Sequence, residues 1–268
     1  MEHIRTALQK AREQQGRPWV EEVLPPPLHA HQIEGDALWS RLPGRRADPV
    51  LAGRKRVVTV GRSDPSHTAF DILRTKVLQA LRQNKWTSIA ITSPTPGCGK
   101  TIVGLNLAFS LEHQKDCRTV LVDLDLRRPQ VAKTLNMSGP RPLESFLRGE
   151  KRIERAFERY GDNLAIAAND RPVRFAAELL QSPETVGILK DMARRLRPDV
   201  VIFDLPPMLA NDDVMAFVPN VDCAILVVAA EATTMNEADL CERELSQKTN
   251  VLGIVLNKCR YMPDKYGY

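Results

Sequence analysis

From residue 68 onward, short apolar runs alternate with longer amphipathic stretches. The apolar runs are rich in Val, Ile and Leu, which is typical of strands buried on both faces of a sheet. We expect strands at residues 88–92, 119–123, 164–168, 200–204, 224–228 and 253–257. We expect helices at residues 68–83, 100–113, about 173–196 and 236–247, with further helices up to about residue 159. This alternation predicts an α/β domain with a mostly parallel central sheet and helices on both faces.

The amino-terminal quarter of the chain has a different texture. Residues 2–14 place Ile4, Leu8 and Ala11 on one face of a short polar helix. Pro, Gly and Arg recur through residues 17–66, which favours an extended, partly disordered arm. The sequence therefore predicts a short helix with an extended arm, an α/β domain and a carboxyl-terminal tail, at residues 1–67, 68–258 and 259–268.

Composition and charge narrow the classes of function. The chain is 43% hydrophobic and 26% charged, with a net charge of +5 that is spread along its length. We therefore expect no nucleic-acid partner, whereas an anionic membrane face or an acidic partner is compatible with the charge. Five widely spaced cysteines argue against a disulfide framework. No apolar run reaches the roughly 18 residues of a membrane span and the amino terminus lacks a signal core, which predicts a cytoplasmic protein.

The segment TSPTPGCGKT, residues 92–101, lies between a predicted strand and a predicted helix. Gly97 and Gly99 can adopt positive φ and let backbone N–H groups approach phosphate oxygens. The start of the helix adds unpaired N–H groups. Lys100 would reach the β- and γ-phosphates, and Thr101 would offer its hydroxyl to Mg²⁺. Because Pro94 stands where a phosphate-binding loop usually begins with glycine, a turn without function is the alternative for this segment alone.

Three aspartates follow predicted strands. Asp123 and Asp125 lie in VLVDLDLRRP, and Asp204 lies in VVIFDLPP. Because the carboxyl ends of parallel strands meet at one edge of a sheet, we expect these carboxylates near Lys100. Carboxylates there can hold hydrated Mg²⁺ or position a nucleophile. The combined set predicts a nucleoside triphosphate site.

These motifs resemble those of the deviant-Walker P-loop ATPases, most closely the bacterial tyrosine kinases of polysaccharide export. The resemblance covers about residues 68–268. The Walker A loop of that family reads S-P-x-P-G-x-G-K-[ST], which residues 93–101 match, so the missing first glycine is expected there. Residues 123–129 resemble the second aspartate motif, Walker A′, and residues 204–207 resemble Walker B. The resemblance implies a three-layer P-loop NTPase fold.

The resemblance also implies that ATP and Mg²⁺ are the cofactors of a phosphotransfer to tyrosine. Lys100 would stabilise the phosphates, and Asp123 would orient or deprotonate the attacking tyrosine hydroxyl. Mg²⁺ would be held by Thr101, Asp125 and Asp204. The nucleotide-binding set is Pro96, Gly97, Cys98, Gly99, Lys100, Thr101, Ile102 and Asn257. Asn257 would contact the adenine, with a simple turn residue as the alternative. Because phosphoryl transfer requires mainly positioning and charge neutralisation, this set is chemically sufficient.

The tail CRYMPDKYGY contains three of the four tyrosines in the chain: Tyr261, Tyr266 and Tyr268. The family uses such a cluster as its autophosphorylation substrate, whereas a frayed terminus is the alternative. The resemblance thus implies an autophosphorylating tyrosine kinase that regulates exopolysaccharide or capsular polysaccharide synthesis and export. It also implies a homo-oligomer and a membrane-embedded polysaccharide co-polymerase that activates the kinase at the inner face of the plasma membrane.

Three features of the sequence depart from the family pattern or separate the family from its rivals. Thr68, Asp71 and Arg74 align with an E-x-x-R-x-x-R motif that joins subunits, so only the last arginine matches. Cys98 replaces a common glutamate, and we interpret it as a tolerated residue at a solvent-facing position, with thiol sensitivity as the alternative. A partitioning-type ATPase would carry a signature lysine at the position of Thr95. That ATPase and a catalytically silent nucleotide-binding regulator are the two alternative functions.

Overall fold

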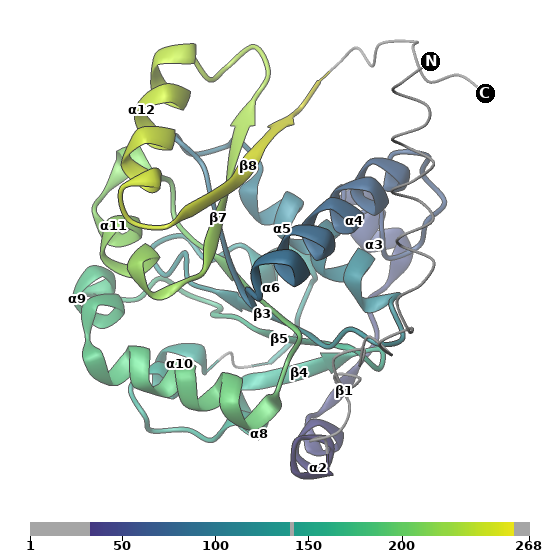
Figure 1. The fold of residues 1–268 in the computed structure, drawn as a ribbon. Coiled ribbons are helices and arrows are strands. Elements are labelled where there is room, and N and C mark those ends of the chain that lie inside the picture. The colour runs from purple at the N-terminus through teal and green to yellow at the C-terminus, as the bar shows by residue number, and fades with distance from the viewer. Residues whose placement is uncertain (1–32, 140–141, 260–268) are drawn as a thin grey trace, which may run out of the picture. The chain divides into compact units, whose positions relative to one another are not determined.

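One sheet organises the chain in the computed structural model, which describes residues 33–139 and 142–259 (Figure 1). Its eight strands are β1 (Gly44–Arg45), β2 (Ser88–Thr92), β3 (Thr119–Asp123), β4 (Phe157–Tyr160), β5 (Leu164–Ala167), β6 (Val200–Asp204), β7 (Cys223–Ala229) and β8 (Asn250–Asn257). They lie in the order β1-β4-β5-β3-β6-β2-β7-β8. Only the β4–β5 pairing is antiparallel. The predicted mostly parallel sheet is confirmed.

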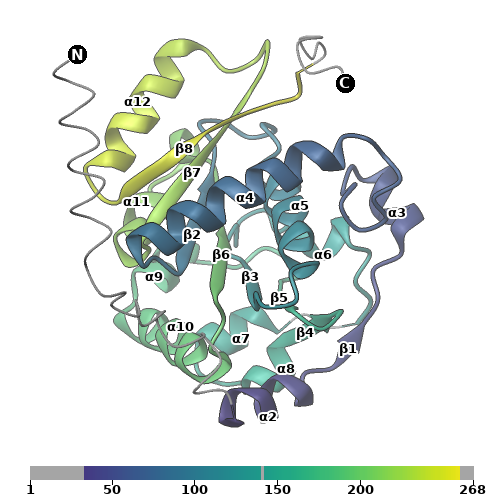
Figure 2. The same ribbon diagram turned by 45° about the vertical axis from the view of Figure 1, so that its right-hand side comes forward.

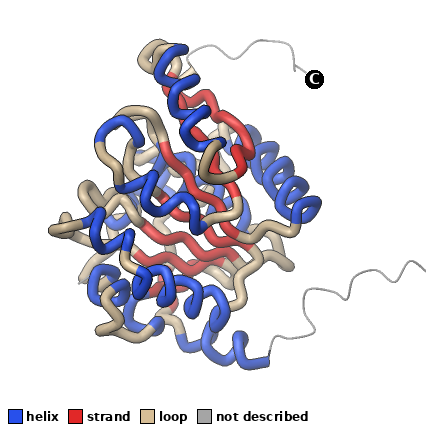
Figure 3. Tube along the Cα trace, turned by 60° about the vertical axis from the view of Figure 1, so that its left-hand side comes forward, coloured by secondary structure: helices blue, strands red, loops and turns tan. Residues whose placement is uncertain are grey.

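Helices pack on both faces of this sheet (Figure 3). They are α2 (Ile33–Arg41), α3 (Pro49–Arg54), α4 (His67–Asn84), α5 (Lys100–Glu112), α6 (Val131–Thr134), α7 (Leu143–Leu147), α8 (Ile153–Ala156), α9 (Ala176–Gln181), α10 (Pro183–Leu196), α11 (Asp213–Phe217) and α12 (Met235–Ser246), with 3₁₀ turns η1 (Met208–Ala210) and η2 (Val218–Asn220). No helix in the described part of the chain combines the length and apolar character that a membrane span requires.

The period-two alternation of strand side chains divides the interior into two cores. Val120 and Val122 of β3 point into the core that α7, α9 and α10 cover. Leu121, between them, points into the core that α4 and α5 cover. Helices α4 and α5 lie side by side on that face (Figure 2). Because the central strands are buried on both sides, their sequences are continuously apolar, which explains why β2, β3 and β6 coincide with the predicted ranges.

Two elements differ from the sequence prediction. Residues up to about 159 read as helical, but β4 forms there and pairs antiparallel to β5 through Tyr160 and Leu164. The helix predicted at 173–196 is interrupted at Ser182, which is extended (φ −61°, ψ 126°). Pro183 disfavours helical geometry at the preceding residue. The Ser182 side chain instead accepts a hydrogen bond from the Glu184 amide and caps α10.

The prediction of an extended arm at residues 17–66 is wrong for residues 35–66, which fold against the sheet. Trp39 of α2 is buried, and its Nε1 donates to the Asp162 carbonyl at 2.8 Å. The Arg118 guanidinium lies 5.3 Å from the centre of the Trp39 ring. Strand β1 extends the sheet beside β4. Residues 17–32 of the predicted arm, and the helix predicted at 2–14, lie outside the described residues.

Composition misled the prediction because the prolines of this segment mark element boundaries. Pro49 stands at the first turn of α3, where its missing N–H has no helical partner to lose. Asp48 caps the same helix by accepting from two backbone amides. Further along, the buried Thr59 bonds to the Asn106 side chain of α5. These features depend on the exact position of a residue in a helix or on contacts with distant segments, so local composition does not reveal them.

We expect Trp39→Ala to lower the free energy of unfolding by about 3 kcal/mol, because a buried aromatic side chain and its hydrogen bond are lost. Val50→Ala, at a position that is 62% exposed in the same segment, should change it by less than about 0.5 kcal/mol. Urea unfolding of the full chain measures both. Equal effects of the two substitutions would contradict the packing of this segment against the sheet.

Candidate nucleotide site

The loop between β2 and α5 has the backbone geometry of a phosphate cradle. Strand β2 lies centrally, between β6 and β7. Gly97 and Gly99 adopt positive φ, +86° and +94°, and Gly99 caps α5. Pro96 and Gly97 are exposed on the loop, whereas Ile102 is half-buried and packs on the core beneath α4 and α5. The amino terminus of α5 thus lies at the carboxyl edge of the sheet, where unpaired N–H groups favour an anion.

The five predicted catalytic and metal-binding residues come together at this edge. Asp123 and Asp204 are paired across neighbouring strands at the ends of β3 and β6. Lys100 Nζ lies 2.7 Å from Asp125 Oδ2 and 3.6 Å from Asp204 Oδ1. Thr101 Oγ1 donates to Asp204 Oδ2 at 2.7 Å. Residues from the phosphate loop, β3 and β6 therefore share one buried polar cluster.

Burial dominates the electrostatics of this cluster. It raises the pKa of Asp123 well above its ordinary range, and the neighbouring charge of Asp204 adds to the effect. Burial also raises the pKa of Asp204, against the opposing attraction of Lys100. For Lys100 itself burial opposes the charge, but Asp204 and Asp125 outweigh it and raise the pKa of the ammonium group. The lysine is therefore charged and offsets the repulsion between the carboxylates.

Asp123 also shapes the loop that follows β3. Its Oδ1 accepts from the Asp125 amide at 3.2 Å, and its Oδ2 accepts from the Val131 amide at 3.1 Å. Both carboxylate oxygens thus accept from backbone amides, one within the Walker A′ segment and one at the start of α6. The predicted base is held in one orientation by the motif that it begins.

The prediction that Cys98 faces solvent is wrong. Its side chain is buried, and Sγ lies 3.5 Å from Thr95 Oγ1 and 3.6 Å from Thr233 Oγ1. Burial acts to raise the pKa of the thiol, but hydrogen bonds from Thr95, Thr233 and the backbone outweigh it and leave the pKa lowered. The residues on either side, Gly97 and Gly99, both adopt positive φ.

Asn257, at the end of β8, supports the phosphate loop. Its Nδ2 donates to the Cys98 carbonyl at 2.9 Å. A Cβ atom on Gly99 would lie only 2.3 Å from that Nδ2, so a larger residue would displace the Asn257 amide, and the positive φ also favours glycine there. Contact of Asn257 with adenine stays a prediction. Tyr261, Tyr266 and Tyr268 lie outside the described residues.

Some residues that hold the site together were missed by the sequence analysis. Thr92 Oγ1 donates to the Pro206 carbonyl at 2.7 Å, and the Met208 amide donates to the Ser93 carbonyl at 2.8 Å. These bonds fix the Walker B segment to the phosphate loop. Arg127 forms a salt bridge with the buried Asp213 of α11. The sequence does show acidic residues shortly after the Walker B motif, Asp213 among them. It does not show that Asp213 pairs with Arg127.

The residues at this edge fit a magnesium–nucleotide complex better than a metal ion alone. Among the described residues, no group of three or more His, Cys, Asp or Glu side chains could hold a metal by itself. Mg²⁺ usually takes only one or two protein carboxylates and completes its shell with water and substrate phosphates. Asp204 Oδ1 is buried without a hydrogen-bond partner and faces the same cluster. A carboxylate oxygen with unused capacity beside a phosphate cradle suits that chemistry.

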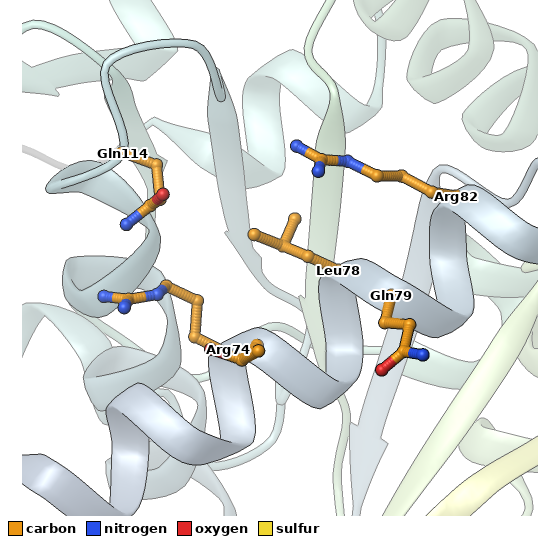
Figure 4. A pocket seen from close by; sticks show the side chains of 6 residues that line it. Arg74, Leu78, Gln79, Arg82 and Gln114 are labelled. Carbon is orange, nitrogen blue, oxygen red and sulfur yellow. The ribbon is translucent and has the colours of Figure 1, made fainter.

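The aligned subunit-joining positions lie elsewhere, on α4. Asp71 accepts from Arg62, Arg74 and Ser110, so Arg74 is engaged within the chain. A cavity of about 460 Å³ opens beside them (Figure 4), lined by Arg74, Thr75, Leu78, Gln79, Arg82 and Gln114. Gln114 follows the carboxyl end of α5, the end opposite the phosphate loop. This cavity is therefore separate from the nucleotide site.

Comparison with known proteins identifies the family. The family model described as "ParA: NUBPL iron-transfer P-loop NTPase" matches residues 85–267. The chain belongs to this family. The P-loop NTPase fold predicted from the sequence is thereby confirmed.

The relatives and a solved structure connect the chain to bacterial tyrosine kinases. The chain is 28% identical over 207 residues to the putative tyrosine-protein kinase EpsB of Ralstonia nicotianae, covering 76% of this chain. It is 29% identical to the tyrosine-protein kinase YwqD of Bacillus subtilis, covering 74% of this chain and 84% of that protein. The kinase domain of the Escherichia coli tyrosine kinase ETK superposes with a TM-score of 0.69 at 27% identity, covering 80% of this chain and 84% of that one. The predicted resemblance to this kinase group is confirmed.

The extent of these matches differs between relatives. The chain spans only 27% of the length of EpsB from Ralstonia. What that longer protein does as a whole is therefore not transferred to this chain by similarity alone.

We expect Gly99→Ala to abolish nucleotide binding, because the new methyl group would meet Asn257 and strain a backbone at φ +94°. Gly97→Ala shares the positive φ but has open space around its Cβ position. It should weaken binding less. Fluorescence titration with an ATP analogue compares them, and equal losses would show that the clash with Asn257 is unimportant.

We expect Lys100→Met to make stability strongly pH-dependent in the absence of nucleotide. A carboxyl group with a higher pKa in the folded than in the unfolded protein destabilises the fold as the pH rises from about 4. Without Lys100 the destabilisation by Asp204 becomes larger. The decrease in the free energy of unfolding should therefore be small near pH 4 and reach about 3 kcal/mol near pH 8. Denaturant unfolding across pH measures it. Lys76→Met, at an exposed position of α4, is the control, and a pH-independent loss at Lys100 would contradict the interpretation.

Proposed function

We propose that this chain is an ATP- and Mg²⁺-dependent protein-tyrosine kinase that phosphorylates itself and regulates exopolysaccharide or capsular polysaccharide synthesis and export. One observation carries the proposal: Lys100, Thr101, Asp123, Asp125 and Asp204 converge around a phosphate cradle in a chain whose relatives are named tyrosine kinases. The arrangement offers cation, hydroxyl and carboxylate groups at one point. Phosphoryl transfer requires those groups and little covalent chemistry.

Each residue has a role that its geometry supports. Bound Mg²⁺ would neutralise charge on the phosphate oxygens, with Thr101, Asp125 and Asp204 as its protein ligands. Lys100 would exchange its carboxylate partners for phosphate oxygens. Asp123 would accept or orient the proton of the tyrosine hydroxyl, because it lies in the same cluster and burial raises the pKa of its carboxyl above the ordinary range.

The connection of the tail to β8 supports tyrosine as the acceptor. Asn257 ends β8 in contact with the Cys98 carbonyl of the phosphate loop. Tyr261 follows four residues later, which is at most about 14 Å of chain. Tyr261 is therefore separated by no more than that length of chain from a residue that contacts the phosphate loop.

We also propose a cytoplasmic location at the inner face of the plasma membrane. A membrane-embedded polysaccharide co-polymerase would recruit and activate the kinase, and subunits would associate into a homo-oligomer. The net charge of +5 is compatible with an anionic membrane surface or an acidic partner segment.

Phosphosite mass spectrometry on the full chain from its own host tests the proposal. We expect phosphate on Tyr261, Tyr266 or Tyr268 that disappears in Lys100→Met, because the variant lacks the cation that stabilises the transferred phosphoryl group. Lys76→Met should retain the phosphate.

Three results would contradict the kinase proposal in different ways. Unmodified tyrosines with ATP hydrolysis that DNA or lipid stimulates would indicate a partitioning-type ATPase. Tight ATP binding without hydrolysis or phosphotyrosine, even with the membrane partner present, would indicate a silent nucleotide-binding regulator. Phosphotyrosine that persists in Lys100→Met would identify another kinase as its source.

A further inference from the structure

Arg127 and Asp213 form a bidentate salt bridge next to the nucleotide site. Arg127 Nε lies 2.7 Å from Asp213 Oδ2, and Nη2 lies 2.9 Å from Oδ1. The Asp213 side chain is 1% exposed, whereas that of Arg127 is 46% exposed. A two-bond contact between a guanidinium and a carboxylate fixes orientation as well as charge. A buried carboxylate also depends on such a partner far more than a surface one does.

The pair holds one side of the segment that carries Asp125. Before Asp125, the Leu124 amide donates to the Asp204 carbonyl at 2.9 Å. After it, the Leu126 carbonyl accepts from the Val173 amide at 2.8 Å, and Arg127 follows with its salt bridge. The backbone on both sides of Asp125 is therefore anchored to other elements. Arg127 supplies the one side-chain ion pair among these anchors.

The other end of the pair is itself fixed to β6. Asp213 begins α11, and Phe217 ends it. The Phe217 ring packs edge to face against Phe203, with centroids 5.0 Å apart. Phe203 directly precedes Asp204 in β6. The salt bridge thus connects the Asp125 segment to the strand that presents the other carboxylate.

We propose that Arg127 and Asp213 are a positioning pair that keeps the Asp125 carboxylate at the nucleotide site when Lys100 turns to the phosphates. The inference rests on the proposed nucleotide-dependent function. In the structure, Asp125 Oδ2 is held by Lys100 at 2.7 Å. When Lys100 moves to phosphate oxygens, Asp125 loses that partner. Its position then depends on its neighbours in the chain, and Arg127 acts through them without touching the nucleotide.

The expected consequence is a specific loss of Mg²⁺-dependent binding. If the Arg127–Asp213 salt bridge is lost, the protein still binds the triphosphate through the phosphate loop and α5. It holds Mg²⁺ less well, because one carboxylate ligand is displaced. Residues that orient a metal ligand from outside typically change metal affinity by about tenfold or more when they are replaced.

The test is a titration of full-length protein with a fluorescent methylanthraniloyl derivative of ATP, over a series of Mg²⁺ concentrations and with EDTA. The variants are Arg127→Gln, Asp213→Asn, their combination, and Arg127→Lys. Arg148→Gln is the matched control, because Arg148 is 40% exposed and pairs with Glu144 on α7, outside the site.

We expect each single substitution to raise the Mg²⁺ concentration for half-maximal binding about tenfold and the double variant to match the single ones. Affinity measured in EDTA should stay within about twofold of the wild type, since the loop contacts are intact. Arg127→Lys, which keeps the charge but loses the two-bond geometry, should give an intermediate shift. The control should leave the Mg²⁺ dependence unchanged.

Three outcomes would overturn the proposal. Multiplicative effects in the double variant would mean that Arg127 acts independently of Asp213. An equal loss of affinity with Mg²⁺ and with EDTA would mean that Arg127 touches the phosphates directly. A lowered melting temperature with unchanged Mg²⁺ dependence, seen also in the mild Arg127→Lys variant, would mean a purely structural role.

The readout is nucleotide binding rather than tyrosine phosphorylation. A protein that binds magnesium–ATP with the expected variant pattern but never phosphorylates tyrosine would support the pair and contradict the kinase. A protein that carries phosphotyrosine, but whose variants show no change in the Mg²⁺ dependence of nucleotide binding, would support the kinase and contradict the positioning pair.

Discussion

The ion pairs of Lys100 with Asp125 and Asp204 are the interaction on which the site depends. Three buried carboxylates lie at or just after the ends of two neighbouring strands, and two of them have raised pKa values because of burial. Such a cluster is stable only with a cation among them. The sheet topology requires this arrangement, because β3 and β6 are neighbours and end at the same edge as the loop after β2. The strand order therefore fixes which charged side chains meet at this edge of the sheet.

The surroundings of Lys100 are held by contacts from several directions. Asn257 supports the phosphate loop from β8, and Thr92 binds the Walker B segment from β2. Lys100 is the group at the centre that can exchange partners, since its ammonium is a point charge on a flexible stem. A rigid frame around one adaptable cation is the arrangement that electrostatic stabilisation of a transferred phosphoryl group requires.

Much of this could be predicted from the sequence, because the relevant signals are local. The central strands are continuous apolar runs, and Lys100 and Asp204 stand at recognisable positions after them. The misses are tertiary. Trp39 donates a hydrogen bond to a carbonyl over a hundred residues away, β4 pairs only because β5 is beside it, and the Cys98 thiol contacts Thr233, which lies in a distant segment. Composition and periodicity describe one segment at a time, so they cannot report a contact between two segments.

The charge balance of the cluster bears on how a nucleotide would enter it. If Lys100 left its partners for a phosphate without replacement, Asp125 and Asp204 would remain buried and mutually repelling, which is strongly unfavourable. Asp204 Oδ1, which is buried without a hydrogen-bond partner, would be free to hold a divalent cation, whose two charges would exceed the one that the lysine withdraws. Under the proposed function, the buried carboxylates would thus favour the joint entry of metal and triphosphate over either alone. The same balance explains why the Asp125 segment needs anchors that are independent of Lys100, since its carboxylate must stay in place while its partner changes.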